Sequence, residues 1–218
     1  MKPLNLSTKN TFRNLPEDKR RRITRAAVRE FAEFGYRRAS VNRIVKEAGI
    51  AKGSLYQYFG GKEDLFLHVF GGFIELVKQT VKENTDRSDR ELFSRLRFVL
   101  QAGLKFIETH PDYFRLYTGL LGEEDIPHRA ELLAKVRFFP IEFFEPLIKS
   151  GQEQGVIRAD VSSGLIIFMI DAVLDRFFMT ASNAQTGGIL DQAGPAGAAA
   201  VIEQIISVLE DGLAGSTG

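Results

Sequence analysis

The stretch that decides the fold covers residues 35–65 and reads GYRRASVNRIVKEAGIAKGSLYQYFGGKEDL. One face of a first short helix is apolar at helical spacing: Val41, Ile44, Val45 and Ala48. Ser40 can cap this helix and Gly49 ends it. A second short helix over 52–59 follows after a three-residue turn. Two short helices joined by a tight turn that contains glycine predict a helix-turn-helix.

The turn and the second helix suit DNA binding. Gly49 can adopt a positive φ, which lets Ile50 tuck into the small core between the helices. Lys52, Gly53 and Ser54 lie at the N-terminus of the second helix, where free N–H groups and the helix dipole favour a phosphate. Eight helical residues rise about 12 Å, close to the width of the major groove. We therefore expect the helix over 52–59 to lie in that groove.

The sequence before and after this stretch is also helical. Asn14, Pro16 and Glu17 mark a helix start, and Gly35 ends that helix. Residues 1–13 are expected to form a flexible basic arm. A long helix follows over 62–84, and further helices are predicted at 90–109, 111–121, 126–154, 161–183 and 196–213.

The predicted fold class is all-α. It has an N-terminal helix-turn-helix domain over 14–66 and a larger C-terminal helical domain over 67–218 for ligand binding and dimerisation. Pro140 and Pro146 predict that the helix over 126–154 is kinked or divided, and residues 185–194 are predicted to be a loop.

Charge is distributed unevenly along the chain. The whole sequence carries 29 Lys or Arg against 28 Asp or Glu. Residues 1–65 hold 15 basic and 7 acidic side chains, a surplus of +8, and residues 66–218 hold 14 and 21, a deficit of −7. A basic N-terminal part on an acidic body is typical of a protein of which one part meets a polyanion.

The composition argues against a secreted protein, a membrane protein and an enzyme. The chain has no Cys, its first 16 residues carry no signal-peptide core, and its longest apolar run, 165–170, is too short for a bilayer. We expect a cytoplasmic protein with no membrane partner. His68, His110 and His128 lack metal-ligand spacing, and no nucleophile–base pair or phosphate loop stands out. The sequence thus predicts no enzyme, no cofactor and no metal site.

From Arg22 to Leu65, the order of residues strongly resembles the N-terminal domain of TetR-type transcriptional regulators. The matching elements are Gly35-Tyr36, Ala39-Ser40-Val41, Ile44, Ala48-Gly49-Ile50, Lys52-Gly53-Ser54-Leu55-Tyr56, Tyr58-Phe59 and Lys62-Glu63-Asp64-Leu65. The remaining part of the chain resembles the family only in being helical.

The resemblance implies a sequence-specific DNA-binding regulator and gives roles to single residues. Tyr56, Tyr58 and Lys62 are implied phosphate contacts, and Lys52 and Gly53 reach phosphate or base edges. The full expected DNA-binding set is Ser40, Asn42, Arg43, Lys52, Gly53, Ser54, Tyr56, Gln57, Tyr58 and Lys62. Within it, the Gln57 amide could pair with adenine, and Arg43 is a second candidate reader of bases. Ile44, Gly49, Leu55 and Phe59 are expected to be scaffold.

The C-terminal domain predicts a homodimer. Residues 165–179 read LIIFMIDAVLDRFFM, apolar nearly all round, so this helix needs burial on more than one side. The resemblance implies a four-helix bundle made by two C-terminal helices of each subunit. Two DNA-binding heads about 34–36 Å apart can read a palindrome. Asp171, Asp175 and Arg176 should be paired, either across the dimer or toward a ligand.

Aromatic residues raise the possibility of a small-molecule site. A Phe-rich stripe is usually core, and a cavity for an apolar or aromatic ligand is the alternative. The candidate ligand-binding residues are Arg97, Phe106, Phe114, Tyr117, Phe138, Phe143, Phe168, Asp171 and Phe178. The leading hypothesis is a repressor released from its operator by such a ligand. The alternatives are a regulator with a solid core and no inducer, or an activator.

Overall fold

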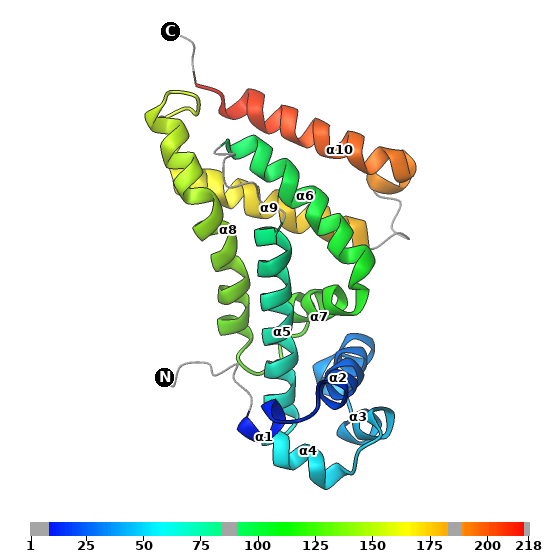
Figure 1. Cartoon of the computed structure of the whole chain (residues 1–218). Helices are drawn as coiled ribbons and strands as arrows, with labels where there is room; N and C mark the ends of the chain where they lie inside the picture. The colour runs from blue at the N-terminus through cyan, green and yellow to red at the C-terminus, as the bar shows by residue number, and fades with distance from the viewer. Residues whose placement is uncertain (1–8, 84–90, 183–188, 216–218) are drawn as a thin grey trace. The chain divides into compact units, whose positions relative to one another are not determined.

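A computed structural model describes residues 9–83, 91–182 and 189–215, apart from the side chains of residues 82, 83, 137–141 and 189–196. Figure 1 shows that the described residues are helical, with one isolated bridge between Ile157 and Ala214. The helices are α1 Asn10–Arg13, α2 Glu17–Arg38, α3 Val41–Ala48, α4 Lys52–Tyr58, α5 Lys62–Glu83, α6 Leu92–Thr109, α7 Pro111–Gly122, α8 Arg129–Glu153, α9 Ser163–Ser182 and α10 Ile189–Leu213. The predicted all-α class is confirmed. No helix in these described ranges is long and apolar enough to cross a membrane.

The chain divides into two compact units. Unit 1 comprises Met1–Lys78 and His110–Lys135, and unit 2 comprises Gln79–Thr109 and Val136–Gly218. Unit 1 thus extends beyond the head expected over 14–66, and within it α7 packs against α2. The helices α5 and α8 each continue along the chain from one unit into the other.

Unit 1 is built on the apolar face of α2. Ile23, Ala27 and Phe31 recur every four residues and are at most 3% exposed, as the helical period requires. They share the unit with fully buried Ile44, Leu55, Leu65 and Phe70 from α3, α4 and α5. Rings extend this core toward α7, where Tyr117 stacks on Phe73 at 5.8 Å between centroids. The helix-turn-helix is thus one side of a larger aromatic core.

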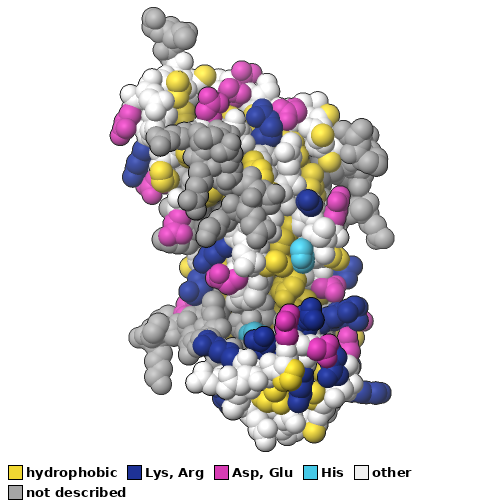
Figure 2. Space-filling model, viewed as in Figure 1, with side chains coloured by type: hydrophobic (Ala, Val, Ile, Leu, Met, Phe, Trp, Pro, Cys, Tyr) yellow, Lys and Arg dark blue, Asp and Glu magenta, His cyan; other side chains and the backbone are white. Residues whose placement is uncertain are grey.

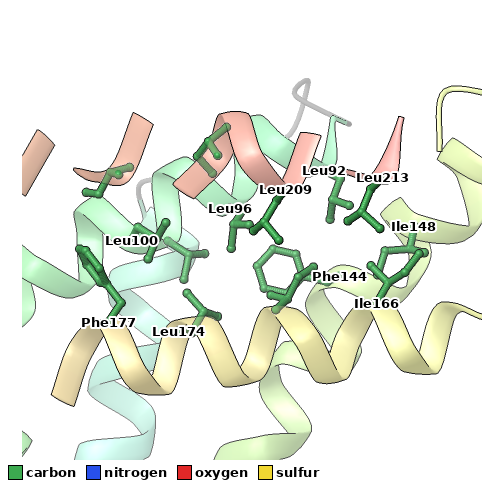
Figure 3. Close-up of a cluster of buried hydrophobic side chains, with 14 of the residues drawn as sticks. Leu92, Leu96, Leu100, Phe144, Ile148, Ile166, Leu174, Phe177, Leu209 and Leu213 are labelled. Atoms are coloured by element: carbon green, nitrogen blue, oxygen red, sulfur yellow. The ribbon is translucent and has the colours of Figure 1, made fainter. Parts of the chain in front are cut away.

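Unit 2 has its own core, made by four helices (Figure 3). Its buried members include Leu96 and Leu100 of α6, Phe144 and Ile148 of α8, Ile166, Ile170, Leu174 and Phe177 of α9, and Val201, Ile202, Ile206, Leu209 and Leu213 of α10. The α9 residues fall at i, i+4, i+8 and i+11, so they line a single face of that helix.

Two predictions concern the C-terminal helices. The loop expected over 185–194 is wrong for 189–194, which belong to α10. The helix α8 runs through Pro140 and Pro146 as one element, so the predicted division is wrong, whereas the alternative of a kink stays a prediction.

Candidate nucleic-acid interface

The turn between α3 and α4 forms as its sequence predicts. Gly49 has φ 64° and ψ 44°, the left-handed conformation that glycine adopts without a Cβ penalty. The N–H of Gly49 donates to Lys46 O at 3.3 Å, and that of Ile50 donates to Val45 O at 3.0 Å. This pair of bonds is a Schellman motif, which satisfies the last carbonyls of α3. The chain can therefore enter α4 after only Ile50 and Ala51.

The helix α4 has a buried face and a solvent face. Leu55 is fully buried on the first, and it anchors the helix against α3. Tyr56 is 45% exposed although it is a large aromatic residue. Lys52, Gly53 and Gln57 are also exposed. Four of the residues expected to meet DNA thus share the solvent-facing side of one short helix.

The other residues expected on α4 and on the start of α3 are less accessible or differently engaged. Ser54 is half-buried, Asn42 is exposed, and Ser40 is half-buried at the N-terminus of α3. The expectation that the Ser40 hydroxyl caps α3 is wrong, since no side-chain capping bond forms. The N–H of Ser40 instead donates to Glu30 Oε1 at 2.7 Å.

Tyr58 is largely buried, at 7% exposed, beneath a helical turn that the sequence did not predict. Residues 10–13, expected within the flexible arm, form α1, and Phe12 is 3% exposed. The Phe12 ring lies 4.9 Å from Phe59 and 6.1 Å from Tyr58 between centroids. Thr11 Oγ1 also donates to Gln57 O at 2.9 Å. The end of the arm is therefore fastened to the C-terminal end of α4.

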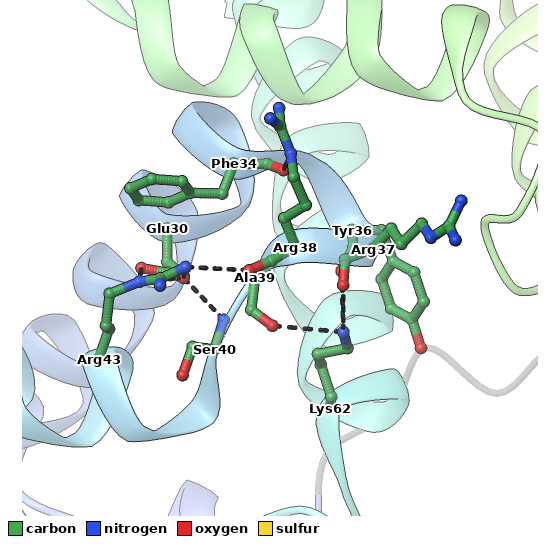
Figure 4. Close-up of polar contacts among 9 residues, drawn as sticks. All are labelled: Glu30, Phe34, Tyr36, Arg37, Arg38, Ala39, Ser40, Arg43 and Lys62. Carbon is green, nitrogen blue, oxygen red and sulfur yellow. Dashed lines mark hydrogen bonds and ion pairs between the residues drawn. The ribbon is translucent and has the colours of Figure 1, made fainter.

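Arg43, expected as a reader of bases, is bound within the head (Figure 4). Its Nε donates to Glu30 Oε1 and Oε2 at 2.9 and 3.0 Å, and its Nη2 donates to Arg38 O at 2.9 Å. The guanidinium also lies 4.1 Å from the Phe34 ring centroid. Glu30 is 5% exposed, and a buried carboxylate requires such a partner. The structure thus gives Arg43 a role in holding α2 to α3.

Lys62, expected as a phosphate contact, is likewise engaged inside unit 1 (Figure 4). Its Nζ donates to the carbonyls of Tyr36, Arg37 and Ala39 at 2.9, 3.2 and 3.3 Å. It also lies 4.7 Å from the Tyr36 ring centroid. Sequence reasoning missed this pairing because the carbonyls lie more than twenty residues away along the chain.

The surface of unit 1 is rich in basic side chains. In Figure 2, Lys and Arg gather with a few carboxylates over this unit. Several of these bases are paired, among them Arg21 with Glu17 and Arg29 with Glu47. Lys46 and Lys52, next to the turn, are exposed. The positive surplus counted from the sequence is thus only partly available to a polyanion.

The candidate ligand residues are divided between the units. Phe114 and Tyr117 are buried in unit 1, with centroids 5.8 Å apart. In unit 2, Phe106 is buried, Phe143 is half-buried, and Phe178 lies against Gly103. The Phe138 side chain lies outside the described residues.

The other three candidate ligand-binding residues are polar or exposed. Arg97 Nε donates to both carboxylate oxygens of Glu203 on α10, at 2.9 and 3.0 Å. Phe168 is 67% exposed on α9, so it does not line an interior cavity of this chain. Asp171 is half-buried on the same helix.

These features define a helix-turn-helix DNA-binding regulator, and comparison with known proteins gives its family. A family model described as "Bacterial regulatory proteins, tetR family" matches residues 23–69. The chain is 31% identical to a TetR family transcriptional regulator from Chloroflexus aurantiacus, whose crystal structure matches with a TM-score of 0.75 over 95% of this chain and 98% of that one. The chain therefore belongs to the TetR family of transcriptional regulators.

Two curated relatives extend the comparison. The HTH-type transcriptional repressor SCO4008 of Streptomyces coelicolor is 28% identical over 193 residues, which are 81% of this chain and 91% of that protein. The fatty acid metabolism regulator protein of Bacillus subtilis is 38% identical over 86 residues, which are 37% of this chain and 44% of that protein. Both relatives are named as regulators, and the first is named as a transcriptional repressor.

Proposed function

We propose that the chain is a homodimeric repressor. In this proposal α4 of each subunit enters the major groove of a palindromic operator, and a small, largely apolar molecule releases the protein from DNA. The observation that carries the proposal is the solvent face of α4. It presents a cation, a glycine, a tyrosine and an amide, while Leu55 and Tyr58 are buried on the other side of the helix.

Each exposed residue of α4 has a chemical role in this proposal. Lys52 supplies a charge for a phosphate. Gly53 has no side chain, and the space where a Cβ would stand is open, so a DNA backbone can approach closely there. The Tyr56 hydroxyl donates to a phosphate oxygen. The Gln57 amide can make two hydrogen bonds to adenine N6 and N7. The backbone carbonyl of Gln57 accepts a hydrogen bond from the Thr11 hydroxyl, which fixes the end of α4 before DNA arrives and leaves the side-chain amide available.

Exposed apolar side chains on unit 2 support the dimer. Leu165 and Phe168 of α9 are 50% and 67% exposed, and Val208 of α10 is 71% exposed. The opposite face of α9 is already buried in the core of the subunit. Exposing large apolar side chains to water is unfavourable in free energy. An isologous contact between two copies would bury them. A dimer also doubles the few base contacts that a seven-residue helix offers.

The proposed ligand is largely apolar because the candidate residues are mostly aromatic. Arg97 is already neutralised by Glu203, which leaves less positive charge for an anionic group. One relative is named a fatty acid metabolism regulator, and a structural neighbour from Bacillus subtilis is described in complex with stearoyl-CoA, so fatty acids and their thioesters are the first class to test.

The DNA-binding part is tested by selecting duplexes from a random library with the wild-type chain and measuring affinity by fluorescence anisotropy. Tyr56→Ala should weaken binding to every duplex, and Gln57→Ala should relax the preference at one position of each half-site. Gln101→Ala, an exposed change on α6, serves as the control. Failure of the wild type to enrich any sequence would contradict the proposal.

The ligand part is tested by thermal melting against a library of fatty acids, thioesters and aromatic metabolites. A molecule that binds only the native state raises the melting temperature, and it should also lower operator affinity. If no compound does both, the regulator without an inducer is favoured. In vitro transcription from a promoter that overlaps the selected duplex distinguishes repression from activation.

A further inference from the structure

A single helical turn in unit 1 is held at both of its ends by side chains from other elements. At Gly35 the path of α2 is interrupted, with φ 68° and ψ 173°. Residues 36–38 then form one more turn, closed by the bond from Ala39 N to Gly35 O at 3.2 Å. This turn leads directly into Ser40 and α3, so its position sets where the helix-turn-helix begins.

Glu123 binds the N-terminal end of this turn. Its Oε2 accepts a hydrogen bond from the backbone N–H of Tyr36 at 3.1 Å. The carboxylate lies so close to Gly35 that a Cβ at that position would overlap it. Gly35 therefore serves two needs, a positive φ and room for this carboxylate. Glu123 acts as an N-cap supplied from 87 residues away.

Lys62 binds the opposite end of the turn through the carbonyls of Tyr36, Arg37 and Ala39. An anion thus lies at the N-terminal end and a cation at the C-terminal end. This order matches the polarity of a helical turn, whose N–H groups favour negative charge and whose carbonyls favour positive charge.

The two capping residues come from the segments that continue into unit 2. Lys62 is the first residue of α5, and Glu123 lies in the connection between α7 and α8. Two further contacts reinforce that connection within unit 1. Asp125 pairs with Arg37 at 3.7 Å, and His128 Nε2 lies 3.2 Å from Glu63 Oε1.

We infer that Glu123 is a positioning residue for DNA binding. By capping the turn over 36–38, it fixes the start of α3 and hence the placement of α4, without touching DNA itself. A displacement of the α7–α8 connection would withdraw the cap and change operator affinity. This inference rests on the proposed binding of DNA through α4.

The test compares Glu123→Ala and Glu123→Gln with Glu124→Ala. Glu124 is exposed and adjacent, so its change removes the same charge without removing the cap. The probe is the duplex that the wild-type chain selects from a random library. Glu123→Ala should lose about tenfold in affinity, the effect of one lost charge-assisted hydrogen bond. Glu123→Gln should lose less, because its amide oxygen still accepts from Tyr36. Glu124→Ala should bind as the wild type does.

Two further readouts separate positioning from general charge or folding effects. Hydrogen exchange in peptides covering 32–40 should be faster in Glu123→Ala and unchanged in Glu124→Ala. The slope of log affinity against log salt should stay at the wild-type value, because no phosphate contact is lost.

Equal affinity of Glu123→Ala and the wild type, or equal losses in Glu123→Ala and Glu124→Ala, would overturn the inference. If Glu123→Ala does not fold, the operator affinity of Glu123→Gln and its amide hydrogen exchange at Tyr36 test the inference instead. If the wild type selects no duplex, the proposed function fails, whereas the exchange comparison still reports whether the cap exists.

Discussion

His68 makes the stability of the chain depend on pH between about 4 and 6.5. The imidazole lies on α5 beside two rings that contact each other, 4.9 Å from the Phe12 centroid and 5.4 Å from that of Phe59. Its Nε2 is 3.3 Å from Thr24 Oγ1. Burial lowers the pKa of His68 from 6.5 to about 4, because the charged ring loses its hydration there.

The size of the effect follows from the two pKa values. Above pH 6.5 the ring is neutral in both native and unfolded chains, and its contribution to stability is fully present. As the pH falls toward 4, the unfolded chain takes up a proton that the native chain refuses, so stability is lost. Each pKa unit corresponds to about 1.36 kcal/mol. The complete loss is therefore about 3 kcal/mol, and most of it is reached near pH 4.5.

Urea denaturation at pH 7 and pH 4.5 measures this loss. The wild type also titrates carboxylates over the same range, so the same pair of measurements on His68→Gln is needed. Gln stays neutral and keeps a polar atom for Thr24. The loss of unfolding free energy between the two pH values should be smaller in the variant by about 2–3 kcal/mol.

Two outcomes would refute this reasoning. One is an equal loss of stability in the wild type and His68→Gln. The other is an NMR titration in which the His68 ring protonates near 6.5 in the native protein. Either result would mean that Phe12 and Phe59 do not keep the ring from water.

The remaining predictions concern the turn, the arm and the dimer. Gly49→Ala should cost about 1–2 kcal/mol in chemical denaturation, because an L-residue is strained at φ 64°; no loss would show that the turn relaxes. Phe12→Ala should cost about 2–3 kcal/mol, less than an interior Phe, because the short α1 can detach. In Phe12→Ala, the rate of amide hydrogen exchange over residues 9–13 should also increase. Phe168→Glu should give monomers in sedimentation, whereas Val156→Glu, an equally apolar and 60% exposed site, should stay dimeric.

Local signals predicted the head well. The apolar period of α3, the glycine at its end and the short run of α4 are readable over fewer than thirty residues. Their physical cause is equally local, since the turn needs only the missing Cβ of Gly49, its bond to Lys46 three positions away, and the bond from Ile50 to Val45 five positions away. The same holds for α5, whose predicted start at Lys62 is confirmed; the expected end at Asn84 lies outside the described residues.

Long-range contacts were not predicted, because they depend on residues that lie far apart in the sequence. Glu30 looks like an ordinary surface carboxylate in the sequence, yet it is buried because Arg43 and the Ser40 N–H converge on it. Phe12 lies in a polar arm, and only the folded head offers it a pocket of rings. The inclusion of α7 in unit 1 likewise depends on packing against α2, which no local period encodes.

Some basic residues of this head are already paired within it, and this limits which of them can contact DNA. Arg43 is paired with Glu30, and Lys62 donates to backbone carbonyls. Lys46 and Lys52, in contrast, are exposed beside the turn. Counterion release counts only cations that meet phosphates, so the salt slope should fall by about 0.9 for each such contact removed. Lys52→Ala should therefore lower both affinity and slope. Lys62→Ala should lower affinity and stability but keep the wild-type slope. A reduced slope in Lys62→Ala, measured by anisotropy across a salt series, would show that its ammonium leaves the carbonyls for a phosphate when DNA binds.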